Sequence, residues 1–396
     1  MPVVGMVGGG QLARMTQQAA IGLGVPLRVL AASPRDSAAL VCADVRIGEH
    51  TSLADLRSFA KGCDAITFDH EHVPSAHIQA LEAAGVACRP SSAALLHAQD
   101  KLVMRERLSA AGAPCPAFAP VDPRDPLAAV EAFAAEHGLP VVLKATTGGY
   151  DGKGVWILES LGADDRRLVE SLSGEGLSLM VEQYVPFRRE LAALVARSPY
   201  GQGAAYPVVE TVQRDGICHE VLAPAPGLDE ELAAEAQRLA LDIAERLDLV
   251  GLLAVELFET GGSAAPGGLL VNELAMRPHN SGHWTIEGAR TSQFEQHLRA
   301  VLNLPLGSTE PTARYTVMAN VLGGDDPDIY PRYLHVMAHD PAVKVHFYGK
   351  EVRPGRKIGH VTALGDDLAE TRERARHAAD YLRWGPAMGP ATKERA

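Results

Sequence analysis

Two apolar segments in the second half of the chain read as the strands of a β-hairpin. They cover residues 252–258 and 269–274, and the loop between them, residues 261–268, consists of glycine, alanine, serine and proline. Such residues do not continue a strand. Each segment carries one glutamate, Glu256 or Glu273, and the two are equally far from the middle of the loop. A symmetric register therefore predicts that the two carboxylates lie opposite each other on one face of the hairpin.

The two glutamates predict a metal site. Like charges placed directly across two strands repel, and a divalent cation held by Glu256 and Glu273 would remove this penalty. Carboxylate oxygens are hard ligands of the kind that Mg²⁺ prefers. The alternative is a solvent-facing hairpin with two unrelated acids, which is the commoner fate of glutamate. Because both acids stand among apolar residues, the metal site is the favoured interpretation.

The composition is ordinary for a soluble globular protein of two or three domains. The chain has 396 residues, of which 46% are hydrophobic and 22% are charged. A net charge of −12 argues against a nucleic-acid-binding surface, and no apolar run approaches membrane-spanning length. The five scattered cysteines form no CxxC pair, which favours reduced thiols and a cytoplasmic location. The N-terminus resembles a strand more than a signal peptide.

The first hundred residues alternate strand-like and helix-like segments. Apolar runs occupy residues 3–7, 26–30, 65–68 and 86–88, and a helical pattern covers residues 11–21. This alternation is typical of a parallel, doubly wound sheet, in which ligands bind at the carboxyl ends of the strands.

A glycine-rich turn follows the first predicted strand. Gly8, Gly9 and Gly10 precede Gln11, so the backbone there is open to an anion at a helix N-terminus. The turn is not a full dinucleotide-binding G-x-G-x-x-G pattern, because its last position is Ala13. A phosphate cradle and a purely structural turn are equally favoured, and a nicotinamide-dependent dehydrogenase remains a weaker alternative.

A second glycine-rich segment lies between two predicted strands near residue 150. A charged helix begins at Asp100, prolines between 114 and 126 indicate a linker or edge segment, and a helix covers residues 127–137. The strand after it ends at Lys144, and the flap at residues 148–154 follows. Backbone amides together with lysines are typical of polyphosphate binding, although a solvated hairpin has the same composition. No P-loop pattern occurs.

An acid-ended strand at residues 179–185 completes a characteristic order of elements. Glu182 stands near its end, and Glu190 precedes a further strand at residues 191–196. Neither acid is informative alone. The two acids are informative because of the order of the elements around them. A strand that ends in a lysine is followed by a glycine-rich flap, then by a strand that ends in an acid, and then by the hairpin with two carboxylates.

In this order of elements the chain resembles the ATP-grasp superfamily, and within it the N5-carboxyaminoimidazole ribonucleotide synthetase family. Four stretches carry the resemblance, at residues 8–15, 148–154, 272–285 and 351–360. The third, which runs from Asn272 to a His-Trp-Thr sequence, is the most specific.

The resemblance implies a mixed α/β and α+β fold with three parts. Residues 1–98 would form a Rossmann-like, doubly wound pre-ATP-grasp domain. Residues 99–310 would form the ATP-grasp domain, with a lid at about 115–182 that includes the flap. Residues 311–396 would form a small β-rich C-terminal domain and a tail, and the tail from residue 384 is interpreted as disordered.

The resemblance also implies an ATP-dependent carbon–nitrogen ligase of purine biosynthesis. Such an enzyme joins bicarbonate to the γ-phosphate of ATP, which gives carboxyphosphate and ADP, and then carboxylates the amine of 5-aminoimidazole ribonucleotide. The implied partners are these small molecules and Mg²⁺, with no nucleic acid and no membrane, and the family suggests a homodimer.

Roles for individual residues follow from the same resemblance. The catalytic residues would be Arg277, Asp151, Tyr150 and His279. ATP would be bound by Lys101, Lys144, Gly149, Tyr150, Asp151, Gly152, Lys153, Gly154, Val155, Glu182, Gln183, Tyr184, Val185, Glu190, Gln213, Asn272 and Glu273. The acceptor substrate would be bound by Gln11, Glu71, Tyr150, Lys153, Arg277, His279, Asn280, Ser281, Lys350 and Arg356. Mg²⁺ would be held by Glu256 and Glu273.

Several alternatives stay open at this point. His283 and Trp284 have a packing interpretation, and the basic turn at residues 351–360 has that of a solvated hairpin, although the joint occurrence of the motifs in order favours the functional interpretation. Gln213 stands where relatives often carry a histidine, so its contact is uncertain. A formate-dependent glycinamide ribonucleotide transformylase shares several of the motifs, and an inactive nucleotide-binding protein is disfavoured because the candidate acids and lysines are present. The acids and histidines of residues 69–72 do not have zinc-motif spacing.

Overall fold

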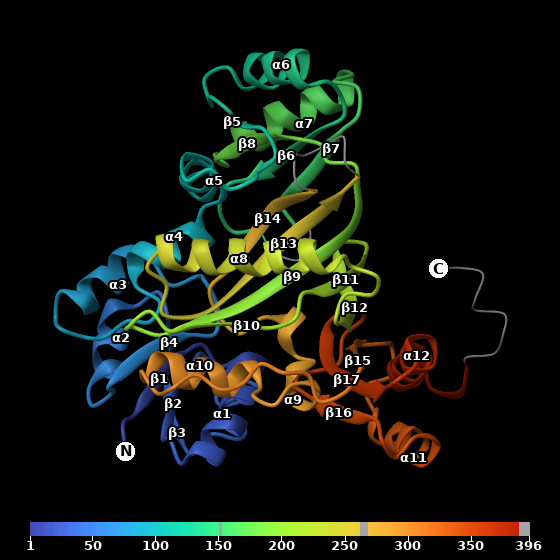
Figure 1. Cartoon of the computed structure of the whole chain (residues 1–396). Coiled ribbons are helices and arrows are strands. Elements are labelled where there is room, and N and C mark those ends of the chain that lie inside the picture. The colour runs from blue at the N-terminus through green and yellow to red at the C-terminus, as the bar shows by residue number, and fades with distance from the viewer. Residues whose placement is uncertain (150–152, 262–267, 388–396) are drawn as a thin grey trace.

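An open parallel sheet forms the N-terminal part of the molecule (Figure 1). The computed structural model describes residues 1–149, 153–261 and 268–387. The strand order is β3-β2-β1-β4, with every pair parallel. Helix α1 packs on one face of this sheet, and α2 and α3 pack on the other, so the predicted doubly wound arrangement is confirmed. The bounds are β1 (Val4–Val7), α1 (Gln11–Leu23), β2 (Leu27–Ala31), β3 (Asp44–Ile47), α2 (Leu53–Ala60), β4 (Ala65–Phe68), α3 (Ser75–Glu82) and α4 (Ser92–Gln99).

The sequence-based prediction of this sheet was wrong at its two margins. Strand β3 was missed because it is an edge strand whose side chains are partly or fully exposed, so its sequence lacks an apolar run. The expected strand at residues 86–88 is reduced to one parallel bridge between Ile66 and Cys88.

A small antiparallel sheet with two helices makes up the residues predicted to be a lid, at the top of Figure 1. The strand order is β5-β8-β6-β7, and α6 and α7 supply the apolar side chains that cover it. The predicted helix at 127–137 and the hairpin around the flap are confirmed, and the proline-rich segment contains the edge strand β5. The bounds are β5 (Phe118–Pro120), α6 (Pro126–His137), β6 (Val141–Ala145), β7 (Val155–Leu158), α7 (Ala163–Gly174) and β8 (Leu179–Gln183).

One large antiparallel sheet runs through the rest of the molecule in the order β14-β13-β9-β11-β12-β15-β17-β16, and β10 pairs with β9. Helix α8 packs on β9 and β13, while α10 packs against α1 and so joins this sheet to the N-terminal one. The bounds are α5 (Lys101–Ala110), β9 (Phe187–Arg197), β10 (Gly203–Ala205), β11 (Val209–Arg214), β12 (Ile217–Ala223), α8 (Glu230–Arg246), β13 (Gly251–Thr260), β14 (Leu269–Ala275), η1 (Asn280–Gly282), α9 (Thr285–Gly288) and α10 (Gln293–Val301).

The C-terminal segment continues this sheet. Strand β15 pairs with β12 from Thr316 to Ala319, which places the predicted C-terminal domain on the same sheet as the hairpin. Helix α12 covers β15 and β17, and α11 lies beside α12 and adds Val336 to the same apolar cluster (Figure 1). Among the described residues, no helix has both the length and the apolar character needed to cross a membrane. The bounds are β15 (Tyr315–Leu322), α11 (Tyr330–His339), β16 (Lys344–Phe347), β17 (Lys357–Gly365), α12 (Leu368–Trp384) and η2 (Gly385–Ala387).

Candidate active site

The two hairpin glutamates lie opposite each other, as the sequence predicts. Glu256 of β13 pairs with Glu273 of β14, whereas the next pair towards the loop is Leu257 with Val271. Asn272 is therefore an extra residue on β14, and a β-bulge of this kind locally re-aims the side chains around it. The bulge brings Asn272 into the same site as Glu273 without breaking the predicted register of the acids.

The opposed carboxylates repel each other inside a partly enclosed site. Burial, followed by the negative charges of Glu273 and Glu190, raises the pKa of Glu256 to about 8, although Lys101 and Arg277 act in the opposite direction. The Nζ atom of Lys101 lies 2.6 Å from Oε1 of Glu273. Two facing carboxylates of which one holds a proton near neutral pH are a donor set that a hard divalent cation fits.

Replacing Glu256 by glutamine is expected to change how stability depends on pH. Between pH about 4.5 and about 8, the folded protein keeps a proton on Glu256 that the unfolded chain has lost. Stability from this group therefore falls as pH rises through that window, and Glu256→Gln removes the fall. The difference in melting temperature, variant minus wild type, should increase across this window when calorimetry is run without nucleotide or metal.

The neighbouring histidine does not account for this pH dependence. His279 also faces Glu256, with Nε2 3.4 Å from Oε1, but burial lowers the pKa of His279 to about 3, so its ring stays neutral over the window. A constant difference in melting temperature at all pH values would contradict the assignment of the slope to Glu256.

A buried ionic network connects the lid to the hairpin. Glu182 at the end of β8 accepts from Lys144 Nζ and from Arg105 Nε, each at 2.5 Å. Although burial raises it, the pKa of Glu182 is lowered to about 2 by Lys144 and Arg105. Lys144 Nζ also lies 3.4 Å from Oδ1 of Asn272. The predicted residues Lys144, Glu182 and Asn272 are thus brought together.

Arg105 is the member of this network that sequence reasoning missed. Its side chain is fully buried on α5, and its Nη1 and Nη2 atoms donate to the backbone oxygens of Val271 and Asn272 at 2.9 and 2.7 Å. Arg105 therefore holds the bulge of β14 and the carboxylate of Glu182 at once. Its position four residues after Lys101, on the same helical face, was the available signal.

After Glu182 the chain combines exposed residues with an apolar contact to the hairpin. The carboxylate of Glu182 pairs with Arg105 and Lys144, which leaves the backbone of residues 182–185 for the predicted adenine contact. Gln183 and Tyr184 are exposed, and Val185 is buried against Leu270 and Phe258.

Glu190 and Gln213 lie together on neighbouring strands, β9 and β11. The Gln213 side chain hydrogen-bonds to Glu190, and burial raises the pKa of this carboxyl despite that bond. The structure places this pair beside the hairpin, because Glu190 is opposite Phe258 in the sheet.

The base of the flap lies over Lys101. A Cβ atom on Gly149 would stand 2.7 Å from the backbone oxygen of Lys153 and 3.8 Å from Cε of Lys101, so only glycine fits there. Lys153 and Val155 are exposed and Gly154 is partly exposed. Tyr150, Asp151 and Gly152 lie outside the described residues.

Several of the residues predicted to bind the acceptor lie around Arg277, just beyond β14. Arg277 Nε lies 2.7 Å from Oε2 of Glu71, so the structure brings these two predicted residues together. Asp69, which sequence reasoning passed over, accepts a hydrogen bond from the Gly10 backbone. Burial raises the pKa of Asp69 to about 6, although that bond and the charges of Arg277 and Lys350 lower it. The position of Asp69 directly after β4 was the signal for it.

The loop after Arg277 is held by internal hydrogen bonds. His279 Nδ1 lies 2.8 Å from Oγ of the buried Ser281. The side-chain amide of Gln293 on α10 accepts from the backbone N–H of His279 and donates to its backbone oxygen. Asn280 exchanges two amide hydrogen bonds with Asn320 of β15. In this structure Asn280 and Ser281 support the loop, whereas His279 faces the acids.

The nearby His-Trp sequence belongs to the core. His283 and Trp284 are buried, and the indole ring stands edge-on to Tyr206. The packing interpretation of these two residues is therefore confirmed.

The C-terminal segment reaches the first glycine turn. Lys350 Nζ donates to Oε1 of Gln11 at the start of α1. Arg356 is exposed, and its Nη1 donates to the backbone oxygen of Glu351 at 3.3 Å. The structure thus unites Gln11 with Lys350, whereas Arg356 points along its own turn.

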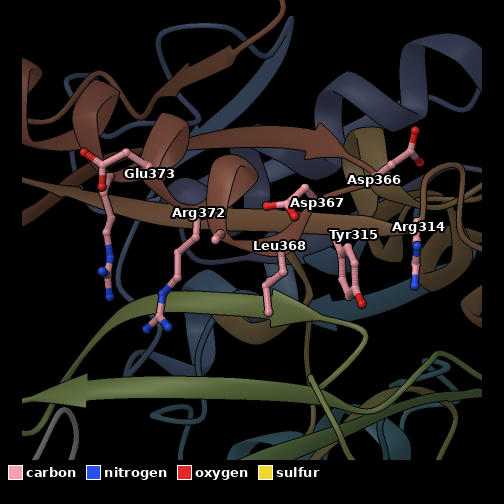
Figure 2. A pocket seen from close by; sticks show the side chains of 9 residues that line it. Arg314, Tyr315, Asp366, Asp367, Leu368, Arg372 and Glu373 are labelled. Carbon is pink, nitrogen blue, oxygen red and sulfur yellow. The ribbon is translucent and has the colours of Figure 1, made fainter.

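A separate hollow lies between the start of α12 and β15 (Figure 2). Its lining includes Arg314, Asp367, Arg372 and Glu373. The predicted site residues are not among the residues that line it, so this hollow is not the candidate active site.

Three family descriptions match successive parts of the chain. The ribonucleotide synthetase preATP-grasp domain matches residues 1–99, the ATP-grasp domain matches residues 106–294, and the phosphoribosylaminoimidazole carboxylase C-terminal domain matches residues 316–374.

Curated relatives and solved structures extend over nearly the whole chain. The chain is 56% identical to the N5-carboxyaminoimidazole ribonucleotide synthase of Mycobacterium bovis, over 98% of this chain and 90% of that protein. The corresponding enzyme of Corynebacterium ammoniagenes is 51% identical, over 96% and 92% of the two chains. A solved synthetase from Thermus thermophilus aligns with a TM-score of 0.84 at 39% identity, covering 96% of this chain and 98% of that one.

A solved synthase from Aspergillus clavatus, in complex with ADP and 5-aminoimidazole ribonucleotide, aligns with a TM-score of 0.85 at 30% identity, over 96% and 98% of the two chains. The chain belongs to the N5-carboxyaminoimidazole ribonucleotide synthase family of ATP-grasp ligases.

Proposed function

We propose that this chain carboxylates 5-aminoimidazole ribonucleotide with bicarbonate at the expense of ATP, in purine biosynthesis. The observation that carries the proposal is the short path from Glu273 to Arg277. The end of β14 connects the opposed acids of the hairpin to Arg277, which pairs with Glu71, so a phosphate site at the acids and an acceptor site at Arg277 would be adjacent. The Aspergillus clavatus relative, which binds ADP and 5-aminoimidazole ribonucleotide, supports both substrates.

ATP is proposed to lie between the lid and the hairpin. The backbone of residues 182–185 would bind the adenine edge against Val185, and Glu190 would accept from the ribose hydroxyls. Lys101, Lys144 and the flap would contact the phosphates. Mg²⁺ held by Glu256, Glu273 and the Asn272 amide would neutralise charge on the transferring phosphoryl group.

The chemistry has two steps in this proposal. A bicarbonate oxygen bonds to the γ-phosphorus and ADP leaves, which gives carboxyphosphate. The exocyclic amine then bonds to the carboxyl carbon, inorganic phosphate leaves, and the amine nitrogen gives up one proton. Arg277 would hold carboxyphosphate through paired hydrogen bonds from its planar guanidinium group. Neutral His279 would lie beside the carboxyphosphate without adding charge. Gln11 and Lys350 would hold the 5′-phosphate at the N-terminus of α1.

Phosphate release from ATP tests the function. Bicarbonate and 5-aminoimidazole ribonucleotide are added singly and together, and release is expected to be fastest with both. Stimulation by formate and glycinamide ribonucleotide instead would assign the transformylase reaction, and no stimulation by either acceptor would overturn the proposal.

Arg277→Lys is expected to lower kcat about 100-fold, the effect of losing one preorganised donor to a reacting oxyanion. Lysine keeps the charge but cannot make the two-pronged contact. The KM for ATP should change little, because Arg277 lies on the acceptor side. Steady-state kinetics with each substrate varied in turn measure this, and Arg290→Lys, an exposed arginine beyond the same loop, is the control. A rise in the KM for ATP with unchanged kcat would refute the assignment.

We further propose the homodimer and the cytoplasmic location that the sequence-based resemblance implies. The absence of a membrane-crossing helix among the described residues is compatible with this location. Sedimentation analysis of the full chain tests the dimer, and cell fractionation tests the location.

A further inference from the structure

Three histidines come together at the C-terminal end of the molecule, apart from the hairpin. His335 and His339 stand one turn apart on α11, and His377 faces them from α12. One ring nitrogen from each lies within 4.8 Å of the others. Figure 1 shows α11 and α12 at the red end of the chain, away from β13 and β14. Neither the family resemblance nor the proposed reaction uses these residues.

The spacing of these nitrogens suits one small cation. Nε2 of His335 lies 3.3 Å from Nε2 of His377. Two imidazole nitrogens bound to one tetrahedral zinc ion at about 2.0–2.1 Å are separated by about 3.3 Å. A hydrogen bond between two neutral rings is the competing explanation, but 3.3 Å is longer than the usual range of about 2.7–3.2 Å for an N–H donor.

The backbone around the cluster is fixed at both ends of α11. Arg332 Nη1 donates to the backbone oxygens of Leu382 and Arg383 at 2.8 and 2.7 Å. At the other end, Arg374 Nε lies 2.7 Å from Oδ2 of Asp340. These contacts hold the two helices antiparallel, and the histidines lie between them. The three rings are therefore close together before any ion binds.

The ring orientations are constrained as well. Tyr381 stacks on His335 with ring centroids 3.6 Å apart and planes 15° apart. His339 and His377 have centroids 4.4 Å apart, and His339 is exposed. Three nitrogen ligands with access to solvent leave a fourth position for water, as in open zinc sites.

We propose that His335, His339 and His377 bind a divalent zinc-class cation that joins α11 to α12. Imidazole nitrogen suits zinc and its neighbours in the first transition row, whereas Mg²⁺ prefers oxygen ligands. The site is therefore chemically distinct from the hairpin acids, and occupying it does not depend on the proposed carboxylation. Val336 is the only fully buried residue of α11, so this helix gains most from an added link.

Zinc titration of the untagged full-length chain in millimolar MgCl₂ tests the proposal. Calorimetry is expected to show one saturable zinc site, and His377→Gln should weaken it at least about tenfold. Zinc at 100 times its Kd should raise the ratio of folded to unfolded wild type about 100-fold, which appears as a higher melting temperature. At the same zinc concentration that rise should be no more than about 11-fold in His377→Gln, while turnover measured without zinc stays unchanged.

Two controls keep the test decisive. His50→Gln alters a different close histidine pair, in which the His50 and His70 ring centroids lie 4.6 Å apart. If His50→Gln removes zinc binding and His377→Gln does not, the proposal is overturned. Co²⁺ provides a readout independent of stability, because a tetrahedral ion absorbs visible light far more strongly than a hexa-aqua ion. Wild type without this absorption, or without saturable zinc binding, would also overturn it.

Discussion

Glu273→Gln is expected to lower kcat about 1,000-fold while the protein stays folded. The substitution keeps the size of the side chain and its ability to accept from Lys101, but removes the charge that opposes Glu256 across the hairpin. With that charge absent, the site loses the anionic oxygen pair that a hard cation requires, and charge on the transferring phosphoryl group is no longer neutralised. A loss of about 4 kcal/mol in transition-state stabilisation corresponds to this factor.

Kinetics at several Mg²⁺ concentrations measure the effect. The variant should respond weakly to added Mg²⁺, and its melting temperature without metal should be at or above that of wild type, because a repulsion has been removed. Glu245→Gln, on the exposed side of α8, is the matched control and should be indistinguishable from wild type. Wild-type turnover by Glu273→Gln at limiting Mg²⁺ would show that the hairpin does not hold the metal.

Arg105→Met is expected to have the largest effect on stability, about 3–5 kcal/mol. Methionine fills much of the same volume but leaves the carboxylate of Glu182 with Lys144 alone. It also leaves the backbone oxygens of Val271 and Asn272 without the guanidinium donors that now satisfy them. A buried charge that loses one partner costs more than the pair contributed.

The urea midpoint of the first unfolding transition checks this, since a chain of several parts does not unfold in one step. Arg107→Met is the control on the same helix: Arg107 is exposed, and the change should stay within about 0.5 kcal/mol. Arg105→Lys should recover part of the lost stability, because lysine restores the positive charge but not the several hydrogen bonds of the planar guanidinium group. Equal midpoints for Arg105→Met and Arg107→Met would mean that the network adds nothing to stability.

The hairpin was predictable because it is a local feature. Its strands are contiguous, its breakers are concentrated in one loop, and its acids are symmetric about that loop. The extra residue at Asn272 was not predictable, since a bulge is selected by contacts such as those from Arg105, which comes from a distant helix. The sequence shows which residue types stand on a strand, but not which distant donor holds its backbone.

The support of the loop after Arg277 was also beyond the sequence. Asn280 and Ser281 were assigned to the acceptor as members of a diagnostic run, yet their side chains bind Asn320 and His279. Residues 272–285 are therefore diagnostic of the family partly because some of them hold the loop in shape. Similarly, β3 escaped prediction because an exposed edge strand carries no apolar run.

The pairing of β12 with β15 limits how this chain can be shortened. A chain ending near residue 310 would lack β15, and the backbone groups of β12 that now bond it would face solvent beside the buried residues Val221 and Leu222. An unpaired apolar edge of this kind recruits strands from other molecules. The C-terminal segment has its own family description, yet it also serves as the cover for an aggregation-prone edge, so it is not a module that can be cut away.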